Sequence, residues 1–261
     1  MKPILGIDIG GTKIAYALVD NYYKTSAVKI LPTPQKNLLA KIEEIIQAHK
    51  PDISGVGIGV PGRVIKNSVV KNLPNIENFK PINLQNYLQK KIHLPIWVEN
   101  DARAFTLAES ILGAGKNFST VVGITLGTGI GGGIVTNKKL IQGLQGLAGE
   151  FGHFIMPDGS YFEHFIRKYG PYKNFHQAKK YLALLVNFVI RSVDPDCIII
   201  GGGWKNVITS EKSLKALLPA TKGGEKAVTK IKKARCSNAG IIGATLPLLK
   251  KTTQEYKIIE T

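Results

Sequence analysis

The hydrophobic pattern of the first half predicts short buried strands followed by a helix. Residues 4–11, 13–20 and 22–31 are apolar runs separated by a glycine-rich turn and an Asp-Asn turn, which indicates three successive strands. Residues 37–50 carry apolar side chains at helical spacing, which predicts a helix. A buried strand over residues 53–62, ending in a Pro-Gly turn, is expected next.

The pattern then alternates between helices and strands. Residues 82–92 predict a short helix, and residues 94–101 predict a strand that stops at an Asn-Asp pair. A second helix is expected over residues 101–115, with Gly113 near its end. Strands that alternate with helices indicate an α/β fold.

The second half repeats the opening of the first. Residues 120–143 again contain an apolar strand, a glycine-rich turn, a second strand, a polar turn and a third strand. In one register, residues 6–10 and 123–127 carry Gly, Ile and Gly at the same places. A repeat at this spacing is too long for a solenoid. It predicts two duplicated domains with a ligand-binding cleft between them.

Three further elements complete the pattern, and the expected domain boundaries follow from them. The elements are a long helix over residues 174–193, a strand over 194–203 and a helix over 238–251. The expected domains are residues 1–113 plus 244–261, forming a small N-terminal domain, and residues 114–243, forming a large C-terminal domain.

Composition favours a globular protein of the cytoplasm. Hydrophobic residues make up 44% of the 261 residues, so a packed core is expected and disorder is not. The longest apolar stretch, residues 181–190, is too short to cross a bilayer. The first residues run straight into a strand and lack the separate regions of a signal peptide. Cys197 and Cys236 form no CxxC pair, so we expect two structural thiols in a reducing compartment. Because the apolar stretch is short, we also expect no membrane partner.

The net charge of +17 has two explanations. It could reflect an anionic partner such as nucleic acid, polyphosphate or a membrane surface. It could equally reflect a general basic bias of the organism's proteins. The lysines are scattered except around residues 221–235, and no nucleic-acid-binding motif accompanies them. We therefore favour the general bias and expect no nucleic-acid partner.

The glycine-rich turns suggest a phosphate site. The run GTGIGG at residues 127–132 fits GxGxxG, but a strand follows it where a dinucleotide fold needs a helix. No GxxxxGK[ST] run exists either. Glycines let backbone amides approach an anion closely, and Thr12 and Thr128 add hydroxyl donors beside them. Asp8, just before the first turn, could orient Mg²⁺ on the phosphates or could instead accept hydrogen bonds from the turn.

Six motifs in order make the chain resemble the ROK-family sugar kinases, which are similar to glucokinase. They are DIGGTK, GVGIGVPG, VENDARA, TLGTGIGGG, AGEFGH and IIIGGG. The resemblance implies the actin-like/hexokinase (ribonuclease H-like) ATPase fold, with two duplicated domains closing on ATP and a sugar. It implies phosphate contacts at Asp8, Gly10, Gly11, Thr12, Lys13, Gly127, Thr128 and Gly129, with Mg²⁺ at Asp8, held directly or through water. It implies adenosine contacts at Gly201, Gly202 and Gly203.

The resemblance also implies a sugar site. Asp101 corresponds to the catalytic base, although an aspartate that opens a helix can also be an N-cap. Asn100, Asp101, Glu150 and His153 correspond to groups that bind sugar hydroxyls, and Glu150 and His153 face the same side if they share a helical turn. Glu163 aligns with a later sugar-contacting glutamate across a deletion. That deletion removes the cysteine-rich zinc loop of many relatives, so no zinc site is expected.

These observations predict an ATP-dependent hexose kinase, with glucose and its 6-hydroxyl as the first choice. N-acetylglucosamine, N-acetylmannosamine, mannose and fructose stay open as acceptors. Polyphosphate is the alternative donor, because it would suit the basic charge. A non-enzymatic sugar-binding regulator is a third alternative, although no segment before the first strand could form a helix-turn-helix. Homodimer formation is the default expectation for the family.

Overall fold

The computed structural model describes residues 2–73, 79–127, 129–169, 175–203, 217 and 228–249. Two five-stranded sheets form its framework. The first has the order β3-β2-β1-β4-β8 and the second the order β11-β10-β9-β12-β13. The strands of the first sheet are β1 (Ile4–Ile9), β2 (Lys13–Val19), β3 (Lys29–Pro32), β4 (Gly55–Val60) and β8 (Ile96–Asn100). Those of the second are β9 (Thr120–Leu126), β10 (Ile130–Thr136), β11 (Lys139–Ile141), β12 (Cys197–Gly202) and β13 (Lys230–Lys233).

The two sheets are duplicates of each other. In each, the first three strands are antiparallel neighbours, and the next two strands add in parallel. The register agrees as well. Ile4 of β1 and Val121 of β9 occupy equivalent positions. Ile4 pairs with one residue of β2 on one side and with Gly55 of β4 on the other, and Val121 pairs with one residue of β10 and with Cys197 of β12. The predicted duplication is therefore confirmed.

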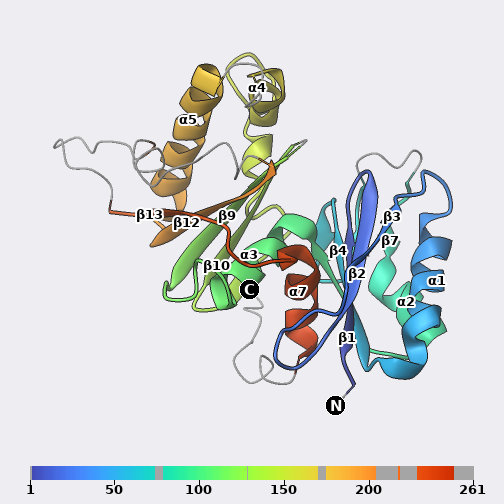
Figure 1. Cartoon of the computed structure of the whole chain (residues 1–261). Helices are drawn as coiled ribbons and strands as arrows, with labels where there is room; N and C mark the ends of the chain where they lie inside the picture. Colours follow the sequence, from blue (N-terminus) through green and yellow to red (C-terminus); the bar gives the residue numbers. More distant parts are fainter. Residues whose placement is uncertain are drawn as a thin grey trace.

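Helices cover the outer faces of the sheets and fill the space between them (Figure 1). Helices α1 (Leu38–His49) and α2 (Leu84–Ile92) pack on the outside of the first sheet in one hydrophobic cluster. Helix α5 (Phe175–Val193) packs outside the second sheet, with α4 (Phe162–Tyr169) beside it. Helices α3 (Asp101–Ile111) and α7 (Ala239–Thr245) lie between the two sheets.

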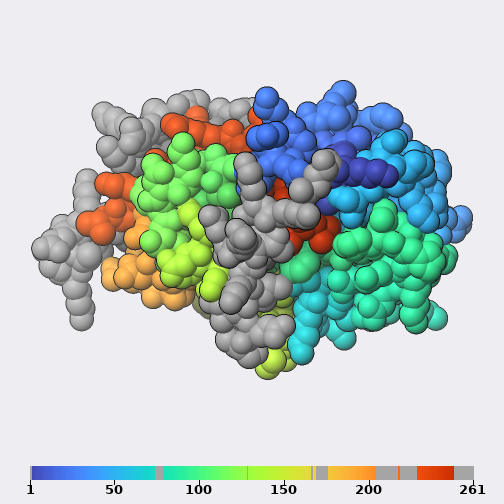
Figure 2. All heavy atoms as spheres, turned by 90° about the horizontal axis from the view of Figure 1, so that it is seen from below, coloured from blue at the N-terminus to red at the C-terminus, as the bar shows by residue number. Residues whose placement is uncertain are grey.

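The two halves of the chain lie at opposite ends of the molecule. Seen from below, the blue and teal residues of the first half and the green and orange residues of the second flank the red α7 (Figure 2). The predicted boundary at residue 244 falls inside α7, and residues 250–261 lie outside the described residues. The division into residues 1–113 plus 244–261 and residues 114–243 stays a prediction.

Glycines allow the two inner helices to pack closely. A Cβ on Gly123 of β9 or on Gly133 of β10 would overlap the side chain of Thr106 in α3. A Cβ on Gly243 of α7 would overlap the backbone carbonyl of Ala104 in α3. Several glycines of the glycine-rich runs therefore serve packing between elements and not ligand binding.

Two predicted elements are shorter than expected. The strand over residues 22–31 is wrong for its first part, because β3 begins at Lys29. There the carboxylate of Asp20 accepts hydrogen bonds from the amides of Tyr22 (2.8 Å) and Lys24 (2.9 Å), which forms a turn. The helix over residues 238–251 ends at Thr245 and continues as the 3₁₀ turn η4 (Leu246–Leu248) that contains a proline.

Several elements were not predicted. They are α4, β13, the 3₁₀ turns η1 (Lys50–Asp52) and η2 (Phe151–His153), and a small sheet of β5 (Val64–Ile65), β6 (Val69–Val70) and β7 (Ile82–Asn83). The other predicted helices and strands are confirmed to within a few residues. Within the described part of the chain, no helix has the length and apolar character needed to cross a membrane.

Candidate active site

Asp8 and Asp101 meet at one edge of the first sheet. Asp8 lies near the end of β1, and Asp101 opens α3 directly after β8. Strand β4 pairs in parallel with both β1 and β8, and Gly59 lies near its end. A Cβ on Gly59 would lie 3.6 Å from Oδ1 of Asp8 and 3.7 Å from Cα of Asp101. The carboxyl ends of parallel strands are where α/β sheets bind ligands, so this edge is the candidate site.

Burial makes Asp101 suited to proton transfer. Desolvation raises the pKa of Asp101 to about 7, and the negative charges of Asp8 and Glu150 add to the effect. The amide of Ala102 donates to Oδ1 of Asp101 at 2.8 Å and acts in the opposite direction. A carboxylate with a pKa near neutrality can accept and release a proton under physiological conditions.

Asp8 is half-buried beside the first glycine turn. Desolvation raises its pKa to about 6, and the nearby Lys13 partly offsets this. A Cβ on Gly240 of α7 would lie 2.5 Å from Oδ2 of Asp8, so only a glycine lets α7 approach this carboxylate. The alternative that Asp8 accepts hydrogen bonds from its own turn finds no support among the described contacts, since Gly10 donates to the carbonyl of Lys13 instead (2.8 Å).

Asn100, and not Asp101, caps helix α3. Its Oδ1 accepts from the amide of Arg103 at 3.0 Å, and its Nδ2 donates to the carbonyl of Gly62 at 3.2 Å. This removes the N-cap explanation for Asp101. Because an amide nitrogen carries two hydrogens, Asn100 keeps one donor for a ligand although it is buried.

Glu150 and His153 share one short turn. Glu150 caps η2, and Nδ1 of His153 lies 2.9 Å from Oε2 of Glu150. The prediction that they face the same side is confirmed. The His153 side chain is half exposed, and its ring meets that of Tyr161 edge-on at 5.3 Å. A Cβ on Gly132 of β10 would overlap the carbonyl of Gly149, and one on Gly131 would lie 2.6 Å from Cβ of Ala102, so β10 lies against both this turn and the start of α3.

The first glycine turn is partly open to solvent. Thr12 and Lys13 are exposed, and Gly10 and Gly11 are half-buried. The hydroxyl of Thr33 donates to the carbonyl of Gly10 at 2.7 Å and so fixes the turn against β3.

The second glycine turn is also accessible at its described residues. The amide of Gly127 donates to the carbonyl of Gly129 at 3.0 Å, and open space surrounds the Cβ position of Gly127. Thr128 lies outside the described residues. The phosphate contacts expected at both turns stay predictions.

Glu163 lies against the second glycine turn. Its Oε2 accepts from the amide of Ile130 at 3.4 Å, and its Oε1 pairs with Arg167 at 2.9 Å. A Cβ on Gly129 would lie 2.7 Å from the same Oε2. The role of Glu163 in sugar binding stays a prediction, because its described partners are Arg167 of α4 and the amide of Ile130 beside the turn expected to bind phosphate.

The three glycines at the end of β12 differ from one another. Gly201 is buried, and a Cβ there would overlap the ring of Phe105 in α3. Gly202 has φ 81°, a conformation that favours glycine, and both Gly202 and Gly203 are exposed. The adenosine contacts expected at these residues stay predictions, and only the last two offer exposed backbone.

Sequence reasoning missed a buried charged pair beside the site. Glu99 and Arg103 are each 1% exposed, and their side chains lie 2.9 Å apart. Oε2 of Glu99 also accepts from Asn67 and from Gln142, at 2.8 Å each. The available signal was a carboxylate inside the apolar run before Asn100, which needs a buried partner.

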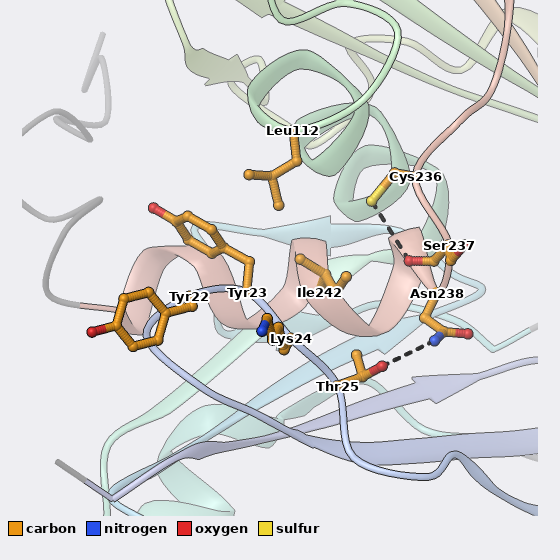
Figure 3. A pocket seen from close by; sticks show the side chains of 9 residues that line it. All are labelled: Tyr22, Tyr23, Lys24, Thr25, Leu112, Cys236, Ser237, Asn238 and Ile242. Atoms are coloured by element: carbon orange, nitrogen blue, oxygen red, sulfur yellow. Dashed lines mark hydrogen bonds between the residues drawn. The ribbon is translucent and has the colours of Figure 1, made fainter.

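A pocket of about 560 Å³ lies between the β2–β3 turn, the C-terminal end of α3 and the N-terminal end of α7 (Figure 3). Its lining includes Leu112, eleven residues beyond the start of α3, and such a helix length corresponds to about 16 Å. Asn238 donates to Thr25 across the pocket at 3.2 Å. Burial raises the pKa of Cys236, which also lines it, to about 11, so this thiol stays protonated at neutral pH. None of its lining residues is one of the predicted site residues.

The described residues contain no group of three or more His, Cys, Asp or Glu side chains that could hold a metal ion. The absence of a zinc site stays an expectation. A lone carboxylate such as Asp8 is nevertheless compatible with Mg²⁺, which commonly uses one or two carboxylates together with phosphate oxygens and water.

Comparison with known proteins places these residues in a family context. A profile of the ROK family matches residues 4–170. The glucokinase of Streptomyces coelicolor is 40% identical over 161 residues, covering 59% of this chain and 50% of that protein. The N-acetyl-D-glucosamine kinase of Citrobacter koseri is 29% identical over 288 aligned positions, covering 90% of this chain and 95% of that protein. The chain spans about half the length of the curated glucokinases that it matches.

A solved structure agrees over most of the chain. A ROK family glucokinase from Streptomyces griseus, in complex with glucose and AMPPNP, superposes with a TM-score of 0.79 at 26% identity. The superposition covers 93% of this chain and 97% of that chain.

Proposed function

The chain belongs to the ROK family and has the actin-like/hexokinase fold, and from this premise we propose that it is an ATP-dependent hexose kinase. It transfers the γ-phosphoryl group of ATP to a sugar hydroxyl, with the 6-hydroxyl of glucose as the first choice. The proposal follows the glucokinase from Streptomyces griseus, which binds glucose together with an ATP analogue.

The meeting of Asp8, Asp101 and Glu150 carries the proposal. These carboxylates come from β1, the start of α3 and the residue before η2, and the charges of Asp8 and Glu150 both raise the pKa of Asp101. Phosphoryl transfer to a hydroxyl needs a base at the acceptor and a phosphate site opposite it. In this proposal Asp101 acts between a phosphate site at the first glycine turn, next to Asp8, and a sugar site at Glu150 and His153.

Asp101 acts as the general base in this proposal. Oδ1 of Asp101 accepts from the Ala102 amide, so Oδ2 takes the proton of the attacking sugar hydroxyl. The sugar oxygen then forms a bond to the γ-phosphorus while the bond to the leaving oxygen of ADP breaks. The proton passes from Asp101 to solvent afterwards. Glu150, His153 and Asn100 bind the remaining hydroxyls and hold the acceptor in place.

The two glycine turns bind the phosphate chain of the donor. Their backbone amides face the phosphates, with help from Thr12 and Lys13. Asp8 is the residue that would hold Mg²⁺, directly or through water, since its half-buried carboxylate lies just before the turn. When bound, Mg²⁺ supplies positive charge that offsets the charge of the phosphates.

An N-acetylhexosamine is the alternative acceptor. The specific observation in its favour is the match to the N-acetyl-D-glucosamine kinase of Citrobacter koseri, which extends over 90% of this chain. No described residue distinguishes the 2-hydroxyl of glucose from the 2-substituent of an N-acetylhexosamine. Glucose stays the first choice because the matched glucokinase has the higher sequence identity to this chain.

Polyphosphate is the alternative donor. The net charge of +17 supports it, because a long polyanion gains more from a basic surface than ATP does. Such a donor would show a much steeper loss of rate with added salt.

A coupled assay of the purified chain tests the proposal. Glucose, N-acetylglucosamine, N-acetylmannosamine, mannose and fructose are each supplied with ATP or polyphosphate, at low and high salt. We expect turnover with glucose and ATP. Rates with polyphosphate that equal or exceed those with ATP would overturn the choice of donor. No rate above background with any pair would overturn the kinase and favour a sugar-binding regulator.

A further inference from the structure

Glu99 is the best-connected buried carboxylate near the candidate base. It lies two residues before Asp101 and is 1% exposed. Its Oε1 accepts from the amide of Asn100 at 2.7 Å and lies 2.9 Å from Nε of Arg103. Its Oε2 accepts from Asn67 and Gln142. A buried carboxylate with this many donors is held in one orientation, because breaking any contact leaves charge unsatisfied.

Of the described residues that donate to Glu99 or form an ion pair with it, Gln142 alone comes from the second half of the chain. Asn67 lies in the turn between β5 and β6, and Arg103 belongs to α3. Gln142 follows β11, and its Nε2 reaches Glu99 at 2.8 Å. One side-chain hydrogen bond therefore joins the second half directly to the residue before the Asn100–Asp101 pair.

Gln142 also begins the loop that carries Glu150. Its carbonyl accepts from the amide of Ala148 at 3.3 Å, which closes a turn over residues 142–148. Gly146 in this turn has φ 68°, and a Cβ there would overlap the carbonyl of Val64 in the first half. Glu150 follows directly, with its amide bonded to the carbonyl of Leu147 at 3.2 Å.

We propose that Gln142 is a positioning residue that sets the placement of the Glu150–His153 turn relative to Asp101. Its side chain contacts the segment that bears the base, and its backbone closes the loop that bears the sugar-binding pair. The inference rests on the proposed function. It predicts that losing the Gln142–Glu99 hydrogen bond disturbs the acceptor sugar more than the phosphate donor, because the glycine turns take no part in this contact.

Gln142→Met tests the proposal, because methionine keeps the length and removes the donor. We expect the KM for the sugar to rise about tenfold or more and the KM for ATP to stay within about twofold. The matched control is Gln145→Met, the same change at an exposed position of the same turn, with both KM values unchanged. A purely structural loss would lower the amount of active enzyme, and so kcat, without separating the two KM values.

A second variant and a binding measurement cover the other outcomes. Gln142→Glu places an acceptor opposite Glu99 and should raise the sugar KM further than Gln142→Met does. Calorimetric sugar binding without donor should weaken in the same order. Equal sugar affinity in the unmodified chain, Gln142→Met and Gln142→Glu would overturn the inference while leaving the kinase standing. Absence of sugar phosphorylation by the unmodified chain would overturn the proposed function itself.

Discussion

At the scale of single residues, the site is built from carboxylates whose surroundings disfavour the ionised form. Burial raises the pKa of Asp8 to about 6 and that of Asp101 to about 7. The sequence indicated both as chemical residues, from a carboxylate before a glycine turn and an Asn-Asp pair after a strand. It could not indicate that both lie close to Gly59, because that depends on β4 pairing with both β1 and β8.

The pH dependence of catalysis should follow these carboxylates. A base must be ionised, so kcat/KM for the sugar should fall as pH decreases through about 7. Below about pH 6 the protonation of Asp8 should steepen the fall. Initial rates between pH 5.5 and 9 measure this, and a flat profile down to pH 5.5 would contradict the assignment of Asp101.

The raised pKa of Asp101 should also make the free energy of unfolding depend on pH. A folded-state pKa raised above the ordinary aspartate value stabilises the fold at low pH, and that stability is lost as pH rises through about 7. Asp101→Asn should therefore raise the free energy of unfolding by about 2 kcal/mol at pH 8 and by little at pH 4. Urea unfolding at both pH values checks it. Equal or lower stability of the variant at pH 8 would speak against a strained carboxylate.

At the scale of elements, the duplicated strands were predictable and the packing between them was not. Apolar runs with glycine turns indicated β1, β2, β9 and β10, and their shared register revealed the repeat. The alternating lysines of β13 resembled a solvated charge run, so this edge strand was missed. Gly133 belongs to the glycine-rich motif TLGTGIGGG, yet it makes room for α3, a tertiary contact that no local pattern encodes.

The contact between α3 and α7 should be intolerant of a single methyl group. Gly243→Ala forces a Cβ against the carbonyl of Ala104, a backbone atom that cannot rotate away. We expect a loss of about 3 kcal/mol in the free energy of unfolding. Gly127→Ala is the stability control, because open space surrounds that position and its unfolding free energy should change by less than about 0.5 kcal/mol. Similar values for the two variants would refute this packing argument.

The same Gly127→Ala variant separates ligand turns from packing glycines. A methyl group there obstructs the close approach of phosphate to backbone amides. The KM for ATP should rise about tenfold, equivalent to about 1.4 kcal/mol, with the sugar KM unchanged. Steady-state kinetics with each substrate varied in turn measures this, and an unchanged KM for ATP would remove Gly127 from the phosphate site.

At the scale of the whole molecule, two similar sheets flank a pair of helices, and the candidate base begins one of them. Helix α3 packs against glycines of the second sheet, and it packs against Gly243 of α7. A sugar bound by Asn100 and Glu150 would therefore join groups from both halves of the chain. Homodimer formation stays a prediction and is open to sedimentation analysis.

Sugar binding should accordingly stabilise the whole chain. A ligand at one hundred times its Kd adds about 2.7 kcal/mol to the folded state. For a chain of this size that corresponds to an increase in Tm of about 5–10 °C. Thermal unfolding with a panel of hexoses ranks the acceptors without any donor present. If no hexose shifts the Tm at millimolar concentration, the sugar site fails as described.

The most direct test of the central claim compares Asp101→Asn with the unmodified chain at saturating glucose and ATP. A positioned base contributes about 10²–10⁴-fold, so kcat should fall by that factor. Calorimetric glucose binding should stay within about threefold, since asparagine keeps the size and the oxygen that accepts from the Ala102 amide. A kcat within tenfold of the unmodified chain would show that the proton goes elsewhere and would contradict the account.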